Sequence, residues 1–363
     1  MIGCAAIILT GLSFKEKEKY LNFGLSLLKK IINFSFDNQG FPKSRNIRQL
    51  IFFLKYFVLI REWLKESQND IPEYLDEIIF YLGQSYSLVW QGVKKDILFN
   101  GNHETDNKNF DQYLNSHGYK FTNNSFEAGG YVILKNKKIA LVMDIGSSPE
   151  KKFSKNYQCG ALSFEIISNN NKLICNSGYF QKIKHKLNDI SKSSANHSTL
   201  IIDNHSSCKI NPSNLEIVQE LKILKKKVIM EKNYWSICSS HDGYSKRYGI
   251  IHERQIEFFP ENNKFIFNFI AIKKFNANPE EHDKLSQKIK EELSRLENIS
   301  LTIQHTSLTS SEVINPEALT GIQQIRRLIQ SPVKFDDGIY SFNRYDEIKE
   351  KVTNTSKLLA THN

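Results

Sequence analysis

The sequence has few cysteines, and none is spaced for metal binding or redox chemistry. There are five, an odd number, and no two form a C-x-x-C pair. Most lie in apolar runs, so we expect small buried side chains and exclude a disulfide framework and a cysteine-based zinc cluster. The five are Cys4, Cys159, Cys175, Cys208 and Cys238.

Long hydrophobic runs are also lacking. The apolar stretch near the start, residues 2–12, is too short to span a bilayer. It has no basic segment before it and no clear small-residue cleavage site after it, unlike a secretory signal. We expect a buried helix here, and a chain that begins inside a helical core is expected to lack upstream sequence. The compartment stays open, and it is cytoplasmic if Met1 is the true start.

Acidic residues are outnumbered by basic ones. The chain has 49 Lys and Arg against 39 Asp and Glu, a formal net charge of +10. Two interpretations are open: a basic groove that attracts an acidic polymer, or compositional drift in a chain rich in Lys, Asn and Ile. No RNP, KH or zinc-finger pattern is present, so we do not expect nucleic acid as a partner.

Helical periodicity dominates the first part of the chain, to about residue 95. Leucines and isoleucines recur at helical spacing between residues 7 and 32. After a loop with glycine and proline, an almost uniformly apolar helix is expected over residues 47–64. Another helix is expected from Pro72, with acidic residues in its first turn. Paired helices joined by short loops predict a helical array or toroid.

From about residue 120 to 272 the apolar pattern changes to a period of two. Turn signals such as Asn169-Asn170-Asn171 separate the short runs. Many short strands at this spacing predict an antiparallel sandwich. The expected strands are Tyr131–Leu134, Ile139–Asp144, Leu162–Ile167, Lys172–Cys175, Ser198–Ile202, Tyr234–Cys238, Tyr248–Ile256 and Phe265–Ile272.

Short polar motifs punctuate this region in a fixed order. They are Leu162-Ser163-Phe164-Glu165, Asn176-Ser177-Gly178, His197-Ser198-Thr199, Ser240-His241-Asp242-Gly243-Tyr244 and His252-Glu253-Arg254. In this order, after a helical array, the motifs resemble those of the heparinase II/III family of polysaccharide lyases. The resemblance covers roughly residues 1–272.

The resemblance implies an α+β multidomain fold. An incomplete α/α toroid is expected over residues 1–118 and an antiparallel β-sandwich over residues 119–272. Residues 273–363 depart from the family pattern and predict a divergent, mainly helical segment, with helices expected over 279–297 and from Asn315. The implied activity is β-elimination on a uronic-acid-containing polysaccharide.

The resemblance also assigns site residues. The family's sandwich histidine falls on Asn156 and its toroid tyrosine on Gln49, so the catalytic positions carry amides. The family's first metal histidine falls on Gln158 and its metal aspartate on Asn176, and only the third ligand, His197, is kept. Amides are poor zinc ligands, so we expect the structural zinc to be lost and no cofactor to be bound.

Two groups of residues are candidates for substrate binding. Arg45 and Arg48 either pair with substrate carboxylates or form a solvated helix start. Asn100, Asn102 and His103 lie in a loop between the two expected domains. Their side chains either hydrogen-bond sugar hydroxyls or belong to an Asn-Gly turn.

The lone imidazole of His197 forms no catalytic constellation, so we expect a hydrogen-bonded sandwich residue rather than a base. Gln158 and Asn176 are expected to form a neutral hydrogen-bonded cluster with it in place of the metal. His241 and His252 fit either the surface or the core.

Two functions remain open. One is a lyase acting on an acidic polysaccharide, and the other is a non-catalytic carbohydrate-binding or scaffold protein that kept the architecture.

Overall fold

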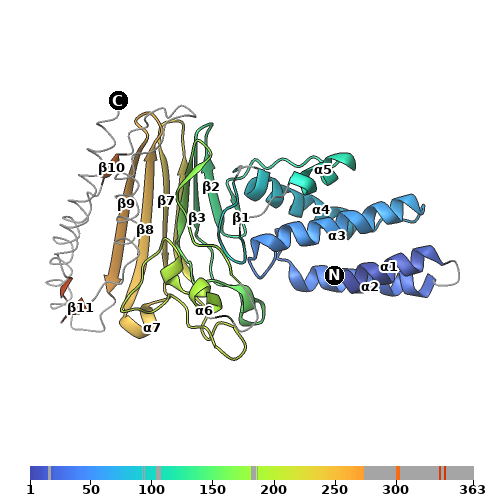
Figure 1. Ribbon diagram of the computed structural model, residues 1–363, viewed down its shortest axis with the longest axis horizontal. Helices are drawn as coiled ribbons and strands as arrows, with labels where there is room; N and C mark the ends of the chain where they lie inside the picture. The colour runs from blue at the N-terminus through green and yellow to red at the C-terminus, as the bar shows by residue number, and fades with distance from the viewer. Residues whose placement is uncertain are drawn as a thin grey trace.

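The computed structural model describes residues 1–14, 18–91, 93, 95–103, 108–180, 185, 187–273, 300–302, 335–336 and 339–340. Within them, helices come first and antiparallel sheets follow (Figure 1). The predicted order of a helical array and then a β-sandwich is confirmed. The expected domain limits remain a prediction, and the helices expected over 279–297 and from Asn315 lie outside the described residues.

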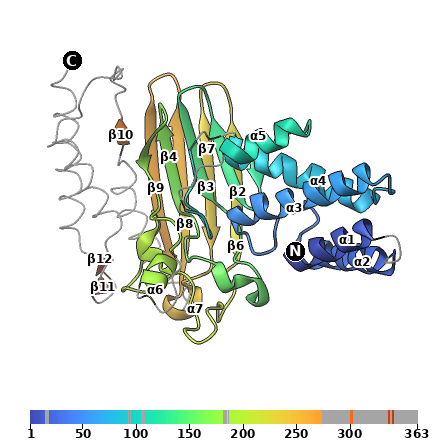
Figure 2. The same ribbon diagram turned by 45° about the vertical axis from the view of Figure 1, so that its right-hand side comes forward.

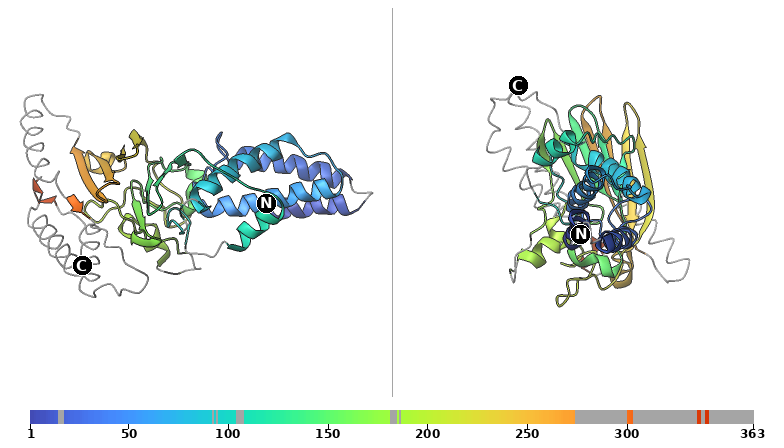
Figure 3. Two further views of the ribbon diagram at one scale, coloured as in Figure 1. Left: turned by 90° about the horizontal axis from the view of Figure 1, so that it is seen from above. Right: turned by 90° about the vertical axis from the view of Figure 1, so that its right-hand side faces the viewer.

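Four helices form two hairpins that extend away from the sheets (Figures 1 and 3). The first pairs α1 (Ile2–Ser13) with α2 (Glu18–Ser35), and the second pairs α3 (Ile47–Glu66) with α4 (Glu73–Tyr86). A π-helical turn, η2 (Ser87–Gln91), and α5 (Lys108–Ser116) follow. The array matches the expectation, and its closure into a toroid remains a prediction. None of the helices in the described residues is long and apolar enough to cross a membrane.

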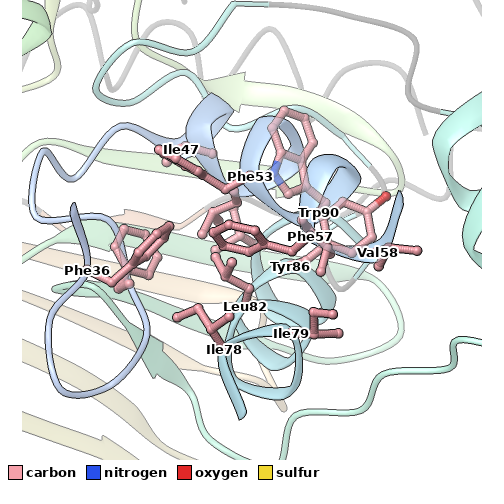
Figure 4. Packing of buried hydrophobic residues seen from close by; sticks show 14 of the residues in the cluster. Phe36, Ile47, Phe53, Phe57, Val58, Ile78, Ile79, Leu82, Tyr86 and Trp90 are labelled. Atoms are coloured by element: carbon pink, nitrogen blue, oxygen red, sulfur yellow. The ribbon is translucent and has the colours of Figure 1, made fainter. Parts of the chain in front are cut away.

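Aromatic and branched side chains fill the space between the helices. Figure 4 shows α3 and α4 meeting through Phe53, Phe57, Ile78 and Leu82, all of them buried. Phe36, just after α2, packs edge-on against Phe53. Burial of this kind supplies most of the stability of paired helices, because short helices are marginal alone.

Two five-stranded antiparallel sheets follow the helices, with orders β1-β2-β3-β4-β5 and β6-β7-β8-β9-β10. The first contains β1 (Glu127–Ala128), β2 (Tyr131–Lys135), β3 (Ile139–Asp144), β4 (Phe164–Ser168) and β5 (Asn171–Ile174). The second contains β6 (Ile223–Met230), β7 (Trp235–His241), β8 (Ile250–Phe259), β9 (Lys264–Lys273) and β10 (Ser300–Thr302). Shorter elements are η3 (Lys151–Asn156), α6 (Leu187–Lys192), η4 (Ser194–Asn196), α7 (Ser245–Tyr248) and the pair β11 (Phe335–Asp336) and β12 (Ile339–Tyr340).

The first sheet lies between the helices and the second sheet, as Figure 1 shows and as the core that it shares with each of them confirms; Figure 2 gives a turned view of both sheets. Alternate residues point to opposite faces of a strand. In β3, Val142 joins the core shared with the helices, whereas Leu141 and Met143 join the core between the two sheets. Because β2 and β3 are covered on both faces, they are apolar almost throughout and were predicted closely from the sequence.

One predicted strand is wrong. Residues 198–202 form no strand, and their only ladder contact is an isolated bridge between Ile202 and His205. Side chains hold the segment instead, because Ser198 Oγ accepts from the Phe164 backbone N–H at 2.8 Å and Thr199 Oγ1 donates to the Ala161 carbonyl at 2.6 Å. Hydroxyl groups of this kind compete with sheet hydrogen bonds.

Candidate functional site

Arg45 joins the helical array to the first sheet. Its guanidinium donates to Asp144 Oδ1 at 2.5 Å and to the backbone carbonyls of Gly129, Gly146 and Ser147. Burial alone would lower the pKa of Arg45, but the Asp144 carboxylate raises it above its ordinary value. The guanidinium is therefore charged and engaged by the protein itself, and we place Arg45 among the residues that join the two layers.

The loop of residues 97–103 links the helices to the sandwich, and its two asparagines point inward. Asn100 Nδ2 donates to Tyr131 Oη at 2.6 Å, and Asn102 Nδ2 donates to a carbonyl within the loop at 2.6 Å. Both side chains are buried, whereas His103 at the end of the loop is exposed. Of the three loop residues considered for substrate binding, His103 is the one that solvent reaches.

Gln158 clamps this loop to the sandwich. Its Oε1 accepts from the Gly101 N–H at 3.1 Å, and its Nε2 donates to the carbonyls of Gly178 at 3.1 Å and Ser191 at 2.7 Å. Its own backbone N–H donates to Asn100 Oδ1 at 3.1 Å. One neutral amide thus connects the linking loop, the segment at Gly178 and α6, and an amide satisfied at both ends stabilises a buried junction.

Asn176 and His197 lie next to this clamp. Asn176 Oδ1 accepts from the backbone N–H of Ser198, the residue after His197, at 3.0 Å. The Ser191 carbonyl that receives the Gln158 amide also lies near the His197 ring and favours its protonated form slightly. Gln158, Asn176 and His197 therefore lie around one junction, but the predicted hydrogen-bonded cluster is wrong at His197, because neither of its ring nitrogens has a hydrogen-bond partner.

The donor atoms of this trio do not fit a zinc ion. Both ends of the Gln158 amide and the carbonyl oxygen of Asn176 already take part in hydrogen bonds. The ring nitrogens of His197 and Nδ2 of Asn176 are buried and have no hydrogen-bond partner, but an amide nitrogen carries hydrogens and cannot coordinate a cation. Among the described residues, no group of three or more His, Cys, Asp and Glu side chains is placed to hold a metal.

His197 is also poorly placed to act as a base on a polysaccharide. Its side chain is 1% exposed, and burial lowers its pKa to about 4. Gly160 packs against the ring, since a Cβ there would lie 3.0 Å from Cγ of His197. The imidazole is thus a neutral core group.

A half-buried guanidinium and an exposed imidazole meet at the start of α3. Nη1 of Arg48 contacts both ring nitrogens of His103, with Nδ1 at 2.9 Å and Nε2 closer, and because a guanidinium only donates, the ring accepts. Partial burial and the neighbouring Arg48 charge lower the pKa of His103, so its ring is neutral. Gln49 accepts a hydrogen bond from Ser44 Oγ at 2.5 Å. This part of the junction offers solvent one cation, one neutral imidazole and one amide.

Asn156 ends η3 and pairs with a residue that the sequence analysis did not select. Tyr179 Oη donates to Asn156 Oδ1 at 3.0 Å, and the Tyr179 backbone N–H donates to the Asn102 carbonyl at 2.7 Å. Burial raises the pKa of Tyr179 to about 12, so the phenol keeps its proton. Tyr179 could have been predicted as a site residue from the sequence, because it directly follows the Asn176-Ser177-Gly178 motif.

Two further buried side chains join the motifs to other segments of the chain. Glu165 Oε1 accepts from the Leu98 backbone N–H at 3.1 Å, which ties the LSFE motif to the linking loop. Arg254 Nη1, from β8, donates to the carbonyls of Leu162 and Ser198. The polar motif residues therefore staple loops to one another.

His241 and His252 belong to the core between the sheets. The Gly243 N–H donates to His241 Nδ1 at 3.0 Å, which leaves the proton of a neutral ring on Nε2. That nitrogen lies 3.1 Å from His252 Nδ1. Burial lowers the pKa of His241 to about 3 and that of His252 well below its ordinary value, so both rings are neutral.

Solved structures share this architecture. The chain matches heparan sulfate lyase HepC from Pedobacter heparinus with a TM-score of 0.59 and 14% identity, over 75% of this chain and 45% of that one. It matches a heparinase III with a TM-score of 0.59 and 17% identity, over 75% and 46%. It matches the heparinase III that is the BT4657 gene product with a TM-score of 0.61 and 15% identity, over 75% and 45%. The chain thus spans under half the length of these structures, and identities this low establish the fold.

Comparison of sequences locates the relationship more closely. Residues 120–268 match the family model described as heparinase II/III-like, C-terminal. No curated protein matches the chain at a significant level. The similarity to the heparinase II/III family is thus established for the domain over residues 120–268.

Proposed function

We propose that the protein binds a uronic-acid-containing polysaccharide at the junction between helices and sandwich, with amides at the two positions where the family has its catalytic histidine and tyrosine. The observation that carries the proposal is the pair of Arg48 and His103. His103 is exposed and Arg48 half-buried, and Asn102, the residue before His103, accepts from the backbone N–H of Tyr179, which contacts Asn156.

The charge of this surface suits an acidic sugar. Arg48 presents a planar guanidinium, which matches a carboxylate in shape and charge, and neutral His103 adds a hydrogen-bonding ring. The formal net charge of +10 favours the approach of a polyanion. Asn156 and Tyr179 add an amide and a phenol for sugar hydroxyls.

Elimination places a further demand on the site. A base must remove the proton next to the carboxylate, and an acid must protonate the leaving oxygen. The side chains of Asn156 and Gln49 exchange no proton near neutral pH, and His197 is buried and neutral. The amides at positions 156 and 49 and the buried His197 are therefore better explained by a site that binds the polysaccharide than by one that cleaves it.

One observation favours residual lyase activity as the second candidate function. His103 is exposed and neutral beside a cation, which are the properties of a base next to a bound carboxylate. In that case His103 removes the proton, and the protonated Tyr179 phenol donates to the leaving oxygen.

Titration calorimetry with heparan sulfate fragments tests the binding proposal. We expect binding by the wild type, and about tenfold weaker binding by Arg48→Gln, since losing one charge-assisted contact costs about 1.4 kcal/mol. Arg247→Gln, which removes an exposed arginine from α7, is the matched control and should bind normally. No binding to heparan sulfate, hyaluronate or alginate would refute the proposal.

Growth of unsaturated-uronate absorbance separates the two candidates. We expect none with the same three polysaccharides. Absorbance that grows with the wild type and disappears in His103→Ala establishes the second candidate, and absorbance that disappears in His197→Ala would make His197 the catalytic group.

A further inference from the structure

An aromatic pair spans the boundary between the helices and the sandwich, next to Asn156. Phe34 near the end of α2 and Phe153 in η3 have ring centroids 5.0 Å apart, with the ring planes tilted by 59°. Phe34 is 59% exposed although it has this partner. Two phenyl rings that meet at the surface from different layers form a ready apolar contact for a ligand.

Two lysines flank the rings. Nζ of Lys43 lies 5.9 Å from the Phe153 ring centroid, and Nζ of Lys152 lies 5.1 Å from the same centroid and 5.8 Å from that of Phe34. Lys43 Nζ donates to the Asn33 carbonyl at 3.0 Å, which fixes its position. Both ammonium groups are therefore held beside the aromatic surface.

Neither lysine has a strong ion pair that would compensate its positive charge. Lys152 pairs with Glu150 at 2.9 Å, but both side chains are more than half exposed, and an ion pair in water contributes little. Lys43 is bonded to a neutral carbonyl. An anionic ligand can therefore recruit both charges at low cost.

The geometry of η3 connects this surface to the junction site. Residues three apart share a face of a 3₁₀ helix, which rises about 2.0 Å per residue. Phe153 and Asn156 are three apart in η3, so they share a face with a separation of about 6 Å along the axis. Asn156 in turn contacts Tyr179.

We propose that Phe34, Lys43, Lys152 and Phe153 form a second saccharide subsite, which takes the next uronic acid along the polysaccharide, in the disaccharide beside the one bound at Arg48 and His103. This inference rests on the proposed function. The apolar face of a sugar ring lies against the phenyl rings, and the two ammonium groups meet its carboxylate or sulfate. A chain of several acidic sugars then contacts both layers of the protein.

Calorimetry with heparan sulfate fragments of different length tests the subsite. We expect Phe34→Ala and Lys152→Gln each to weaken binding of a long fragment about fivefold, while a disaccharide, which occupies one subsite, binds as it does to the wild type. Phe23→Ala is the matched control, because Phe23 lies on the same helix with the same 59% exposure. Because both phenylalanines of this comparison face solvent, the variants should keep the wild-type melting temperature.

The outcomes separate the two proposals. If Arg48→Gln weakens binding but Phe34→Ala and Lys152→Gln do not, the subsite is refuted and the proposed function stands. If the wild type binds no fragment, both fail. Aromatic rings beside lysines also suit single-stranded nucleic acid, so binding of an oligonucleotide that depends on Phe34 where the saccharide does not bind would overturn the assignment.

Discussion

Arg45 and Asp144 form a buried ion pair that joins the segment before α3 to the end of β3. Their side chains are 9% and 1% exposed. Tyr131 closes the group, because the guanidinium lies 4.7 Å from its ring centroid and its hydroxyl donates to the Arg45 carbonyl at 2.7 Å. The helices and the sandwich are thus connected by charge as well as by apolar contact.

Removing one member of this pair should destabilise the protein strongly. Arg45→Ala leaves the Asp144 carboxylate buried without its cation, and we expect a loss of about 3–5 kcal/mol in the free energy of unfolding, measured with guanidinium chloride. Asp144→Ala should cost a similar amount. Arg247→Ala, on the surface, should stay within about 0.5 kcal/mol of the wild type. An equally small effect of Arg45→Ala would show that the pair does not stabilise the fold.

Gln158 should contribute nearly as much to the free energy of unfolding as the ion pair of Arg45 and Asp144, although its side chain carries no charge. Gln158→Ala leaves the Gly101 N–H and the Gly178 and Ser191 carbonyls without their partner. A buried group that loses its hydrogen bond costs about 1–3 kcal/mol, so we expect about 2–5 kcal/mol overall. Exchange of the Gly101 amide hydrogen measures the local effect and should be faster in the variant. Unchanged exchange would contradict a clamp at this position.

How far the sequence predicts the fold differs between strands. The two strands covered on both faces, β2 and β3, have continuous apolar runs and were located closely. In contrast, β6 was missed, because Lys225, Lys226 and Lys227 interrupt its apolar pattern. It lies at the edge of its sheet, where lysines discourage pairing with other chains. An edge strand of this kind resembles a solvated loop in sequence.

The sequence indicated which residues of the site lie near one another, but not which contacts they make. The shared polar character of Gln158, Asn176 and His197 was visible in the motifs, and the structure brings them together. The burial of Arg45 was not visible, because its partners Asp144 and Tyr131 lie far along the chain and only the folded sheet brings them near. The same holds for Phe34 and Phe153, which belong to different layers.

The side chains of Gln158, Asn176 and His197 predict that the protein binds no zinc. Elemental analysis of the wild type should give well under one zinc per chain, and a chelator should leave its melting temperature unchanged. In the double variant Gln158→His with Asn176→Asp, two ligands of the kind zinc prefers join His197, and we expect stoichiometric zinc and a melting temperature that falls on chelation. About one zinc per chain in the wild type would refute this prediction.

The buried histidines predict a loss of stability in acid. The pKa values of His197, His241 and His252 are lowered in the folded protein, to about 4, to about 3 and well below the ordinary value. Between about pH 6.5 and the folded pKa, the unfolded chain binds a proton at each position that the folded chain does not. Stability therefore falls as the pH falls, by about 1.4 kcal/mol per pH unit for each histidine.

Urea unfolding between pH 7 and pH 5 measures this slope. His197→Gln removes one of the three groups, so we expect the free energy of unfolding to fall less steeply below pH 6, by about 1.4 kcal/mol per pH unit. His117→Gln, which removes an exposed imidazole, is the control for the substitution itself. If His197→Gln keeps the wild-type slope, the His197 imidazole is protonated in the folded protein and faces water. In that case it becomes available as a base again, which connects this measurement to the choice between binding and elimination.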